Sequence, residues 1–337
     1  MSLNPKIGID LGTANTVVFL EGKGIVIQEP TVVAVTSEDN RVVAVGNEAK
    51  EMLGRTPGTI IASRPMRDGV IADYVVTEAM LRYFIRKVCG RSWLLRPEVM
   101  ICVPAGCTQV EQRAVEAATM AAGAKEVFII QEPFAAALGA GIPVAEASGN
   151  MVVDMGGGSS QAVVISLGGV VSGRSVRVSG NALDDSISQF LRKKHGIIIG
   201  EQTAEEIKLT IGRAMAWETD KLKPLTVKGR DSIQGLPKTV IVSPEEIEEA
   251  LRPKIDRIIA MIKSVLEQVP PELASDIIDK GIIMVGGTSQ LRNLDRLLTQ
   301  ETGVPCHVAE EPLLCVAKGT GIALENLDLY RRAISKR

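Results

Sequence analysis

The feature that most constrains this chain is an internal repeat of one strand–turn–strand pattern. The segments KIGIDLGTANTVVFLEGKG and MVVDMGGGSSQAVVISLGG each contain an apolar strand, an Asp-x-Gly turn, polar residues and a second apolar strand. Aligning Asp10 with Asp154 also aligns Gly12 with Gly156 and Gly24 with Gly168 without a gap. Self-similarity of this kind marks duplicated structural units. The repeat therefore predicts two related domains, each opening with a strand, a turn and a second strand.

Length and composition agree with two globular domains. The chain has 337 residues, of which 45% are hydrophobic and 23% are charged, and domains usually contain about 100 to 200 residues. With 38 basic and 40 acidic residues, it lacks the basic patch that characterises nucleic-acid binders. We expect no nucleic-acid partner.

The chain shows no targeting or metal-binding signature. The start MSLNPKIGID lacks the regions of a signal peptide, and no stretch reaches the roughly 18 apolar residues of a spanning helix, so we expect a cytoplasmic protein. Neither a disulfide framework nor a zinc site is indicated, because the five cysteines form no Cys-x-x-Cys pair. His195 and His307 also lack partners at metal-ligand spacing. We expect His195 to end a helix before Gly196.

The remaining pattern is typical of α/β layers with mixed sheets. Strand runs such as EVMICVP, EVFII and GIIMVGG alternate with helical runs such as VEQRAVEAATMAAGA. Ser243 and Glu246 predict a capping box for a helix over 244–269, which Pro253 should kink or split. Thr203 and Glu206 suggest a second box. Residues 32–45 and 225–242 are expected to be small β-containing insertions.

The chemistry is expected in the two turns. Short polar side chains and glycines leave backbone N–H groups free to converge on an anion, and phosphate is the natural ligand. Carboxylates cannot bind phosphate directly, so Asp10 and Asp154 indicate a hard cation between them, for which Mg²⁺ is the expected ion. An isolated GGGSS turn is more often a simple hairpin. The second copy, and a third glycine turn at Gly286 and Gly287, favour a Mg-nucleotide clamp.

These motifs resemble those of the actin, heat-shock-chaperone and sugar-kinase superfamily. DLGTANT resembles its first phosphate loop, DMGGGSS its second, and GGTSQL its adenosine motif. From about residue 6 to 330, segments such as GKGIVIQEPTVVAV, RPMRDGVIADY and PPELASDIIDKGIIMVGG are similar to those of the MreB family of bacterial actin-like proteins.

The resemblance implies an α/β, actin-like fold of two duplicated domains with the nucleotide between them. Domain I would comprise 1–145 with 317–337, including a small subdomain at about 32–70. Domain II would comprise 146–316, including a small subdomain at about 180–242. The family pattern further implies head-to-tail filaments, paired antiparallel, that associate with the inner membrane, act with cell-wall elongation proteins and direct rod shape. A weak ATPase coupled to polymerisation is expected.

The resemblance also assigns ligands. Asp10 and Asp154 would serve Mg²⁺, and Glu205 with Lys208 the ribose of ATP or ADP, although these two could instead form a surface ion pair. The phosphates and the adenine would contact the turn residues Gly12, Thr13, Ala14, Asn15, Gly156, Gly157, Gly158, Ser159, Gly286, Gly287 and Thr288.

Several positions depart from the family pattern. Gln131, before Glu132, and Gln161 stand where the family has acidic residues, and Asn181 and Thr288 stand where it has Asp and Gly. An amide can orient the attacking water but lacks the general-base capacity of a carboxylate. We therefore expect slow hydrolysis, with Gln131, Glu132 and Asp154 as the catalytic candidates.

Ser92-Trp93-Leu94-Leu95 is the candidate membrane contact. Such a hydrophobic loop resembles the one that MreB proteins insert into the bilayer interface, and Trp93 and Leu94 are the expected contacts. They could instead pack inward against the neighbouring strand.

Two other functions are compatible with the superfamily. A chaperone-type ATPase would need a substrate-binding domain after the nucleotide domain, and a sugar or acetate kinase would need a base near an acceptor hydroxyl. No segment supplies a convincing acceptor site.

Overall fold

Two large sheets organise the protein, of which the computed structural model describes residues 4–90 and 96–336. The first has six strands in the order β19-β10-β9-β1-β2-β3, and the second has five in the order β13-β12-β11-β17-β18. Their strands are β1 Lys6–Leu11, β2 Asn15–Leu20, β3 Gly24–Pro30, β9 Glu98–Val103, β10 Glu126–Gln131, β11 Asn150–Met155, β12 Ser160–Ser166, β13 Gly169–Val176, β17 Ile282–Val285, β18 Cys306–Val308 and β19 Ile334–Lys336.

The predicted repeat is visible in the strand pairing. Strand β1 pairs antiparallel with β2 and parallel with β9, and β11 pairs antiparallel with β12 and parallel with β17. Asp10 lies opposite Val17, and Asp154 lies opposite Gln161. Each Asp-x-Gly turn therefore follows the same kind of strand in each sheet, with the aspartate at the carboxyl end of that strand.

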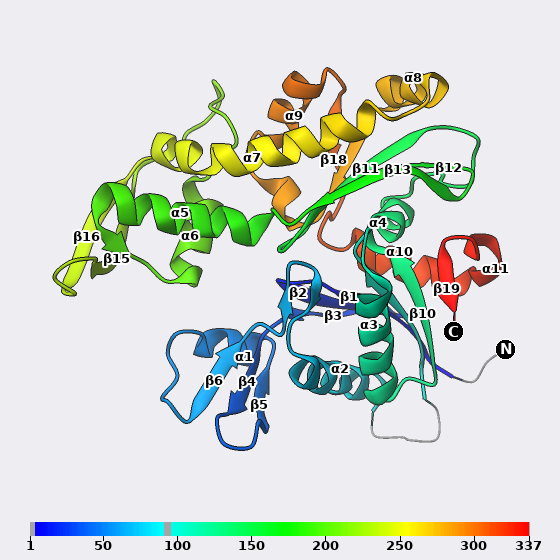
Figure 1. The fold of residues 1–337 in the computed structure, drawn as a ribbon, viewed down its shortest axis with the longest axis horizontal. Helices are drawn as coiled ribbons and strands as arrows, with labels where there is room; N and C mark the ends of the chain where they lie inside the picture. The colour runs from blue at the N-terminus through cyan, green and yellow to red at the C-terminus, as the bar shows by residue number, and fades with distance from the viewer. Residues whose placement is uncertain (1–3, 91–95, 337) are drawn as a thin grey trace.

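Helices cover the two sheets, and α4 and α10 lie between them (Figure 1). Both helices pack against β9, and α4 also contacts β11 and β12. An apolar cluster that includes Phe134, Val152 and Cys315 fills this region. The helices are α1 Asn47–Met52, α2 Tyr74–Cys89, α3 Gln109–Ala121, α4 Glu132–Gly139, α5 Gly180–His195, α6 Glu201–Ile211, α7 Pro244–Leu266, α8 Pro271–Lys280, α9 Leu294–Thr302, α10 Cys315–Glu325 and α11 Leu327–Tyr330.

Two small three-stranded sheets extend from the large ones. Strands β4 Val33–Thr36, β5 Val42–Val45 and β6 Ile60–Ser63 form one beside α1, and β14 Ile197–Ile198, β15 Leu225–Asp231 and β16 Pro237–Val242 form the other beside α6. A short pair, β7 Met66–Arg67 and β8 Val70–Ile71, completes the strands of the described residues. Both β-containing insertions predicted from the sequence are confirmed.

Helix α7 follows its sequence pattern in all but one respect. Ser243 and Glu246 form the predicted capping box, and the apolar stripe that includes Ile247, Leu251 and Ile258 is buried. The helix nevertheless runs through Pro253 without a break, so the split, one of the two effects expected of this proline, is wrong. The second predicted box is also wrong, because α6 begins at Glu201 after Gly200 and has no side-chain cap.

His195 has the structural role expected of it. It is the last residue of α5, Gly196 follows in the left-handed conformation, and the ring nitrogen Nε2 lies 2.9 Å from Oε1 of Glu246. All five cysteines are free thiols.

No helix within residues 4–90 and 96–336 is long and apolar enough to cross a membrane. The predicted membrane contacts Trp93 and Leu94 lie outside the described residues.

Candidate functional site

The two Asp-x-Gly turns meet face to face. A β-carbon placed on Gly158 would lie 2.5 Å from the hydroxyl oxygen of Thr13 and 2.9 Å from the Cα of Asp68. The hydroxyl of Thr13 also accepts a hydrogen bond of 2.9 Å from the N–H of Gly69. A side chain at position 158 would separate these segments, so the glycine permits the contact. The sequence predicted that backbone could be approached closely at this turn. It did not predict that the approaching segment would be the other Asp-x-Gly turn.

Buried carboxylates gather beside the turns. Asp154 is 5% exposed and Glu132 is 8% exposed, and Asp10 interacts electrostatically with both. Burial raises the pKa of Asp10 from 3.8 to about 6. Burial, followed by repulsion from Asp10, raises the pKa of Asp154 from 3.8 to about 7. Burial also raises the pKa of Glu132 well above its usual range, with repulsion from Asp154 and Asp10 adding to it. These three predicted site residues are therefore brought together.

The cluster has the composition of a cation site. Ligand atoms of Asp10, Cys102 and Glu132 lie within 4.8 Å of one another, and the Cys102 thiol donates to Asp10 Oδ1 at 3.4 Å. Carboxylates that repel one another in a buried site are stabilised by a divalent cation, and their hard oxygen atoms suit Mg²⁺.

Two glutamines, Gln131 and Gln161, lie at this cluster. The side-chain amide of Gln161 donates to the carboxylate of Glu132, and its oxygen accepts from the backbone N–H of Ala105. Gln131 ends β10 and, with Ser159, lines an open pocket of about 1120 Å³. Gln161 thus positions Glu132, whereas Gln131 faces space that a small molecule or water can enter.

A second pocket of about 680 Å³ contains some of the residues predicted to contact the nucleotide. Lys208, Gly287 and Thr288 line it, together with Leu183, Leu209, Gly212, Gln290, Leu291 and Arg292. The Lys208 ammonium lies 2.8 and 2.9 Å from the two carboxylate oxygens of Asp184 and donates to the carbonyl of Gly180 at 3.2 Å. Asp184 therefore fixes Lys208, a role that the sequence analysis missed because local spacing carries no signal for it.

Glu205 does not join this pocket. Its carboxylate lies 3.2 Å from the ammonium of Lys50 on α1, and Gln202 donates to the carbonyl of Lys50 at 2.7 Å. A groove of about 1010 Å³ between α1 and α6 contains Lys50 and Glu205. The alternative of an ion pair between Glu205 and Lys208 is also not what the structure shows, since each has a different partner from a distant segment.

The remaining predicted turn residues fall in the same region. Asn15 is exposed at the start of β2, and Gly12 and Ala14 are half-buried in the turn before it. A β-carbon on Gly286 would lie 2.7 Å from Oδ1 of Asp154, so the third glycine turn abuts the second Asp-x-Gly turn, which includes Gly156.

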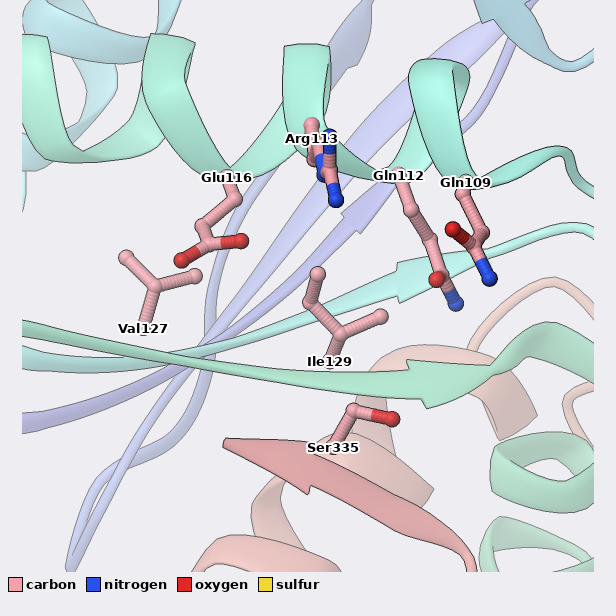
Figure 2. A pocket seen from close by; sticks show the side chains of 7 residues that line it. All are labelled: Gln109, Gln112, Arg113, Glu116, Val127, Ile129 and Ser335. Carbon is pink, nitrogen blue, oxygen red and sulfur yellow. The ribbon is translucent and has the colours of Figure 1, made fainter. Parts of the chain in front are cut away.

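A further small pocket lies under α3 and contains none of the predicted site residues. Figure 2 shows Gln109, Gln112, Arg113 and Glu116 descending from the helix toward Ile129 on β10 and Ser335 on β19. It is separate from the turns that hold the carboxylates.

The two related sheets, with paired glycine turns and a carboxylate cluster between them, define the actin-like class of fold. The structure superposes on MreB5 of Spiroplasma citri bound to AMPPNP with a TM-score of 0.92 and 34% identity, covering 98% of this chain and 99% of that one. MreB5 bound to ADP gives a TM-score of 0.90 at 34% identity, covering 97% and 99%. A MamK double helical filament gives a TM-score of 0.79 at 19% identity, covering 96% and 99%, which indicates the fold alone.

Sequence comparison gives the particular family. The model of the MreB/Mbl protein family matches residues 4–332. The chain is 51% identical to the cell shape-determining protein MreB of Escherichia coli K12, over 96% of this chain and 94% of that protein. It is 46% identical to the cell shape-determining protein Mbl of Bacillus subtilis 168, over 98% of each. The chain therefore belongs to the MreB/Mbl family.

Proposed function

We propose that this protein is a nucleotide-binding bacterial actin homologue that polymerises and takes part in determining cell shape. The observation that carries the proposal is the contact between the two Asp-x-Gly turns beside the carboxylates of Asp10, Glu132 and Asp154. The 51% identity to a cell shape-determining MreB supports the cellular role. The MreB5 structures bound to AMPPNP and ADP support an adenine nucleotide as ligand.

The geometry suggests how ATP would be held. Backbone N–H groups of the two turns would bind its phosphates, because free N–H groups in glycine-rich turns converge on anions. Lys208, fixed by Asp184, would face the ribose, and Gly287 the base. Glu205 is a lesser contributor, since Lys50 occupies its carboxylate.

Asp10 and Asp154 would hold Mg²⁺, which supplies charge neutralisation for the phosphates. The mutual repulsion of these two carboxylates favours this assignment. Gln131, at the open pocket, would orient the attacking water, while Gln161 holds Glu132 in place. An amide orients water without accepting its proton, so hydrolysis would be slow.

We further infer two domains. The first comprises 1–145 with 317–337 and includes a small subdomain near 32–70. The second comprises 146–316 and includes a small subdomain near 180–242. The small sheets β4–β6 and β14–β16 support the subdomains. The packing of α10 on β1 and β9 supports the return of the chain to the first domain.

The proposal also includes head-to-tail assembly into filaments that pair antiparallel. It further includes contact with the inner membrane through Trp93 and Leu94, and association with cell-wall elongation proteins. These parts of the proposal rest on membership of the MreB/Mbl family. Family identity of this extent favours the filament over a chaperone-type or kinase-type ATPase.

Sedimentation with and without Mg-ATP tests the proposal. We expect the protein to pellet above a critical concentration only with nucleotide and Mg²⁺, and the double variant Asp10→Asn, Asp154→Asn to stay in the supernatant. Protein that binds no adenine nucleotide by isothermal titration calorimetry, or that phosphorylates a small-molecule acceptor, would overturn it.

A further inference from the structure

Three separate segments of the protein meet at one backbone carbonyl, that of Gly156. The hydroxyl of Thr288 donates to this oxygen at 2.8 Å, and the hydroxyl of Ser179 donates to it at 2.6 Å. The N–H of Gly180 reaches the same oxygen at 3.3 Å. The third glycine turn, the start of α5 and the second Asp-x-Gly turn are therefore joined at a single acceptor.

This junction is closely packed. Thr288 is 7% exposed and Ser179 is fully buried, and their hydroxyl oxygens lie 3.4 Å apart. A β-carbon on Gly180 would stand 3.0 Å from the Thr288 hydroxyl. Removing the Thr288 hydroxyl would leave the Gly156 oxygen bonded to Ser179 and Gly180 only, and the third glycine turn would lose its hydrogen bond to the second Asp-x-Gly turn.

Thr288 also borders the pocket that we assign to the base and ribose, beside Gly287 and Lys208. Gly156 belongs to the turn that we assign to the phosphates. The Thr288 hydroxyl is thus a side-chain link between the two ends of the proposed nucleotide site. A residue without a side-chain hydroxyl, such as glycine, cannot make such a link.

We propose that Thr288 is a positioning residue that ties the base-side turn to the phosphate-side turn, so that both must open together before the nucleotide leaves. This inference rests on the proposed function and adds a mechanism that slows nucleotide exchange. A net hydrogen bond contributes about 0.5–1.5 kcal/mol, and about 1.4 kcal/mol corresponds to a tenfold change in rate. Loss of the link should therefore accelerate release roughly two- to tenfold.

The test compares Thr288→Val, Thr288→Ser and Thr288→Gly. Valine keeps the volume without the hydroxyl, serine keeps the hydroxyl without the methyl group, and glycine removes the whole side chain. Dissociation of a fluorescent ADP analogue is followed by stopped flow after addition of excess ADP. We expect release from the Val and Gly variants to be roughly two- to tenfold faster than from the wild type, and the Ser variant to stay within about twofold. Equal rates for Val and wild type, or a Ser variant as fast as Val, would overturn the proposal.

A second measurement separates this proposal from the proposed function. Backbone amide exchange over 156–159 and 286–290 is compared in nucleotide-free wild type, Thr288→Ser and Thr288→Val proteins. Faster exchange in both segments of the Val variant alone supports the link even if the wild type binds no nucleotide, whereas unchanged exchange in both rejects it.

Discussion

A β-carbon on Gly157 would lie 2.6 Å from the β-carbon of Ala14 and 3.2 Å from its backbone nitrogen. These two residues belong to the two copies of the repeated turn, and their contact closes one copy against the other.

A substitution at Gly157 tests this contact. Gly157→Ala should push the turns apart and weaken nucleotide binding at least about tenfold, since packed backbone cannot give way cheaply. Calorimetric titration with ADP measures this. Gly58→Ala is the matched control, because a β-carbon there meets nothing within 4 Å. Equal affinity in both variants would contradict the arrangement.

The carboxylate cluster makes stability depend on pH in the nucleotide-free protein. The pKa values of Asp10 and Asp154 rise from 3.8 to about 6 and about 7 on folding. The folded state therefore binds these protons more tightly, and that stabilisation, complete below about pH 4, is lost as the pH rises through 6 to 7. We expect the melting temperature to fall by roughly 3 to 5 °C between pH 5 and pH 8.

Asp154→Asn should flatten this dependence, because a neutral amide neither titrates nor repels Asp10. Asp231→Asn serves as the control, since the pKa of Asp231 is lowered to about 2 and its carboxyl stays ionised throughout. An unchanged slope in the Asp154 variant would show that other groups cause the dependence.

Hydrolysis depends on Gln131 in this account. Gln131→Glu should raise the rate of phosphate release at least about tenfold, because a carboxylate at the open pocket can accept a proton from the attacking water. A single-turnover phosphate-release assay measures the rate. Equal rates for the variant and the wild type would remove Gln131 from the mechanism.

The sequence predicted the fold well, because the fold depends largely on local patterns. Short segments of sequence were sufficient to predict the repeat around Asp10 and Asp154, the small β insertions and the α7 capping box. Contacts between distant segments were not predictable in this way. Lys50 is 155 residues from Glu205, and Asp184 binds Lys208 from another helix, so neither partner could be predicted from the local spacing of Glu205 and Lys208. The capping box predicted from Thr203 and Glu206 does not form, because α6 begins two residues before Thr203, at Glu201.

Because Lys208 and Glu205 lie in different surroundings, we expect their substitution to have different effects on ADP binding. Lys208→Ala should weaken ADP binding at least about tenfold, since the Lys208 side chain lines the pocket. Its loss would also leave the carboxylate of Asp184 without its ion-pair partner. Glu205→Ala should weaken ADP binding threefold or less, because its partly exposed ion pair with Lys50 lies outside that pocket and surface pairs contribute about 0–1 kcal/mol. Titration of both variants with ADP decides the matter. Equal losses would restore Glu205 to the ribose site.

The capping of α7 offers a test of stability alone. Ser243→Ala removes both the side-chain acceptor of the Glu246 N–H and the capping box, and should cost about 1 kcal/mol in urea unfolding. Thr203→Ala, at the position where no cap forms, should cost roughly 0.5 kcal/mol or less. Equal losses would mean that the Ser243 cap contributes nothing specific.

Electron microscopy of the purified protein with Mg-ATP on a lipid monolayer tests the central claim most directly, because it reports assembly and membrane attachment together. We predict paired filaments on the lipid with ATP, and bare lipid for Trp93→Ser, Leu94→Ser protein that still assembles in solution. Bare lipid and no filaments in solution across a concentration series of the wild type would contradict the claim and leave a nucleotide-binding protein that does not polymerise.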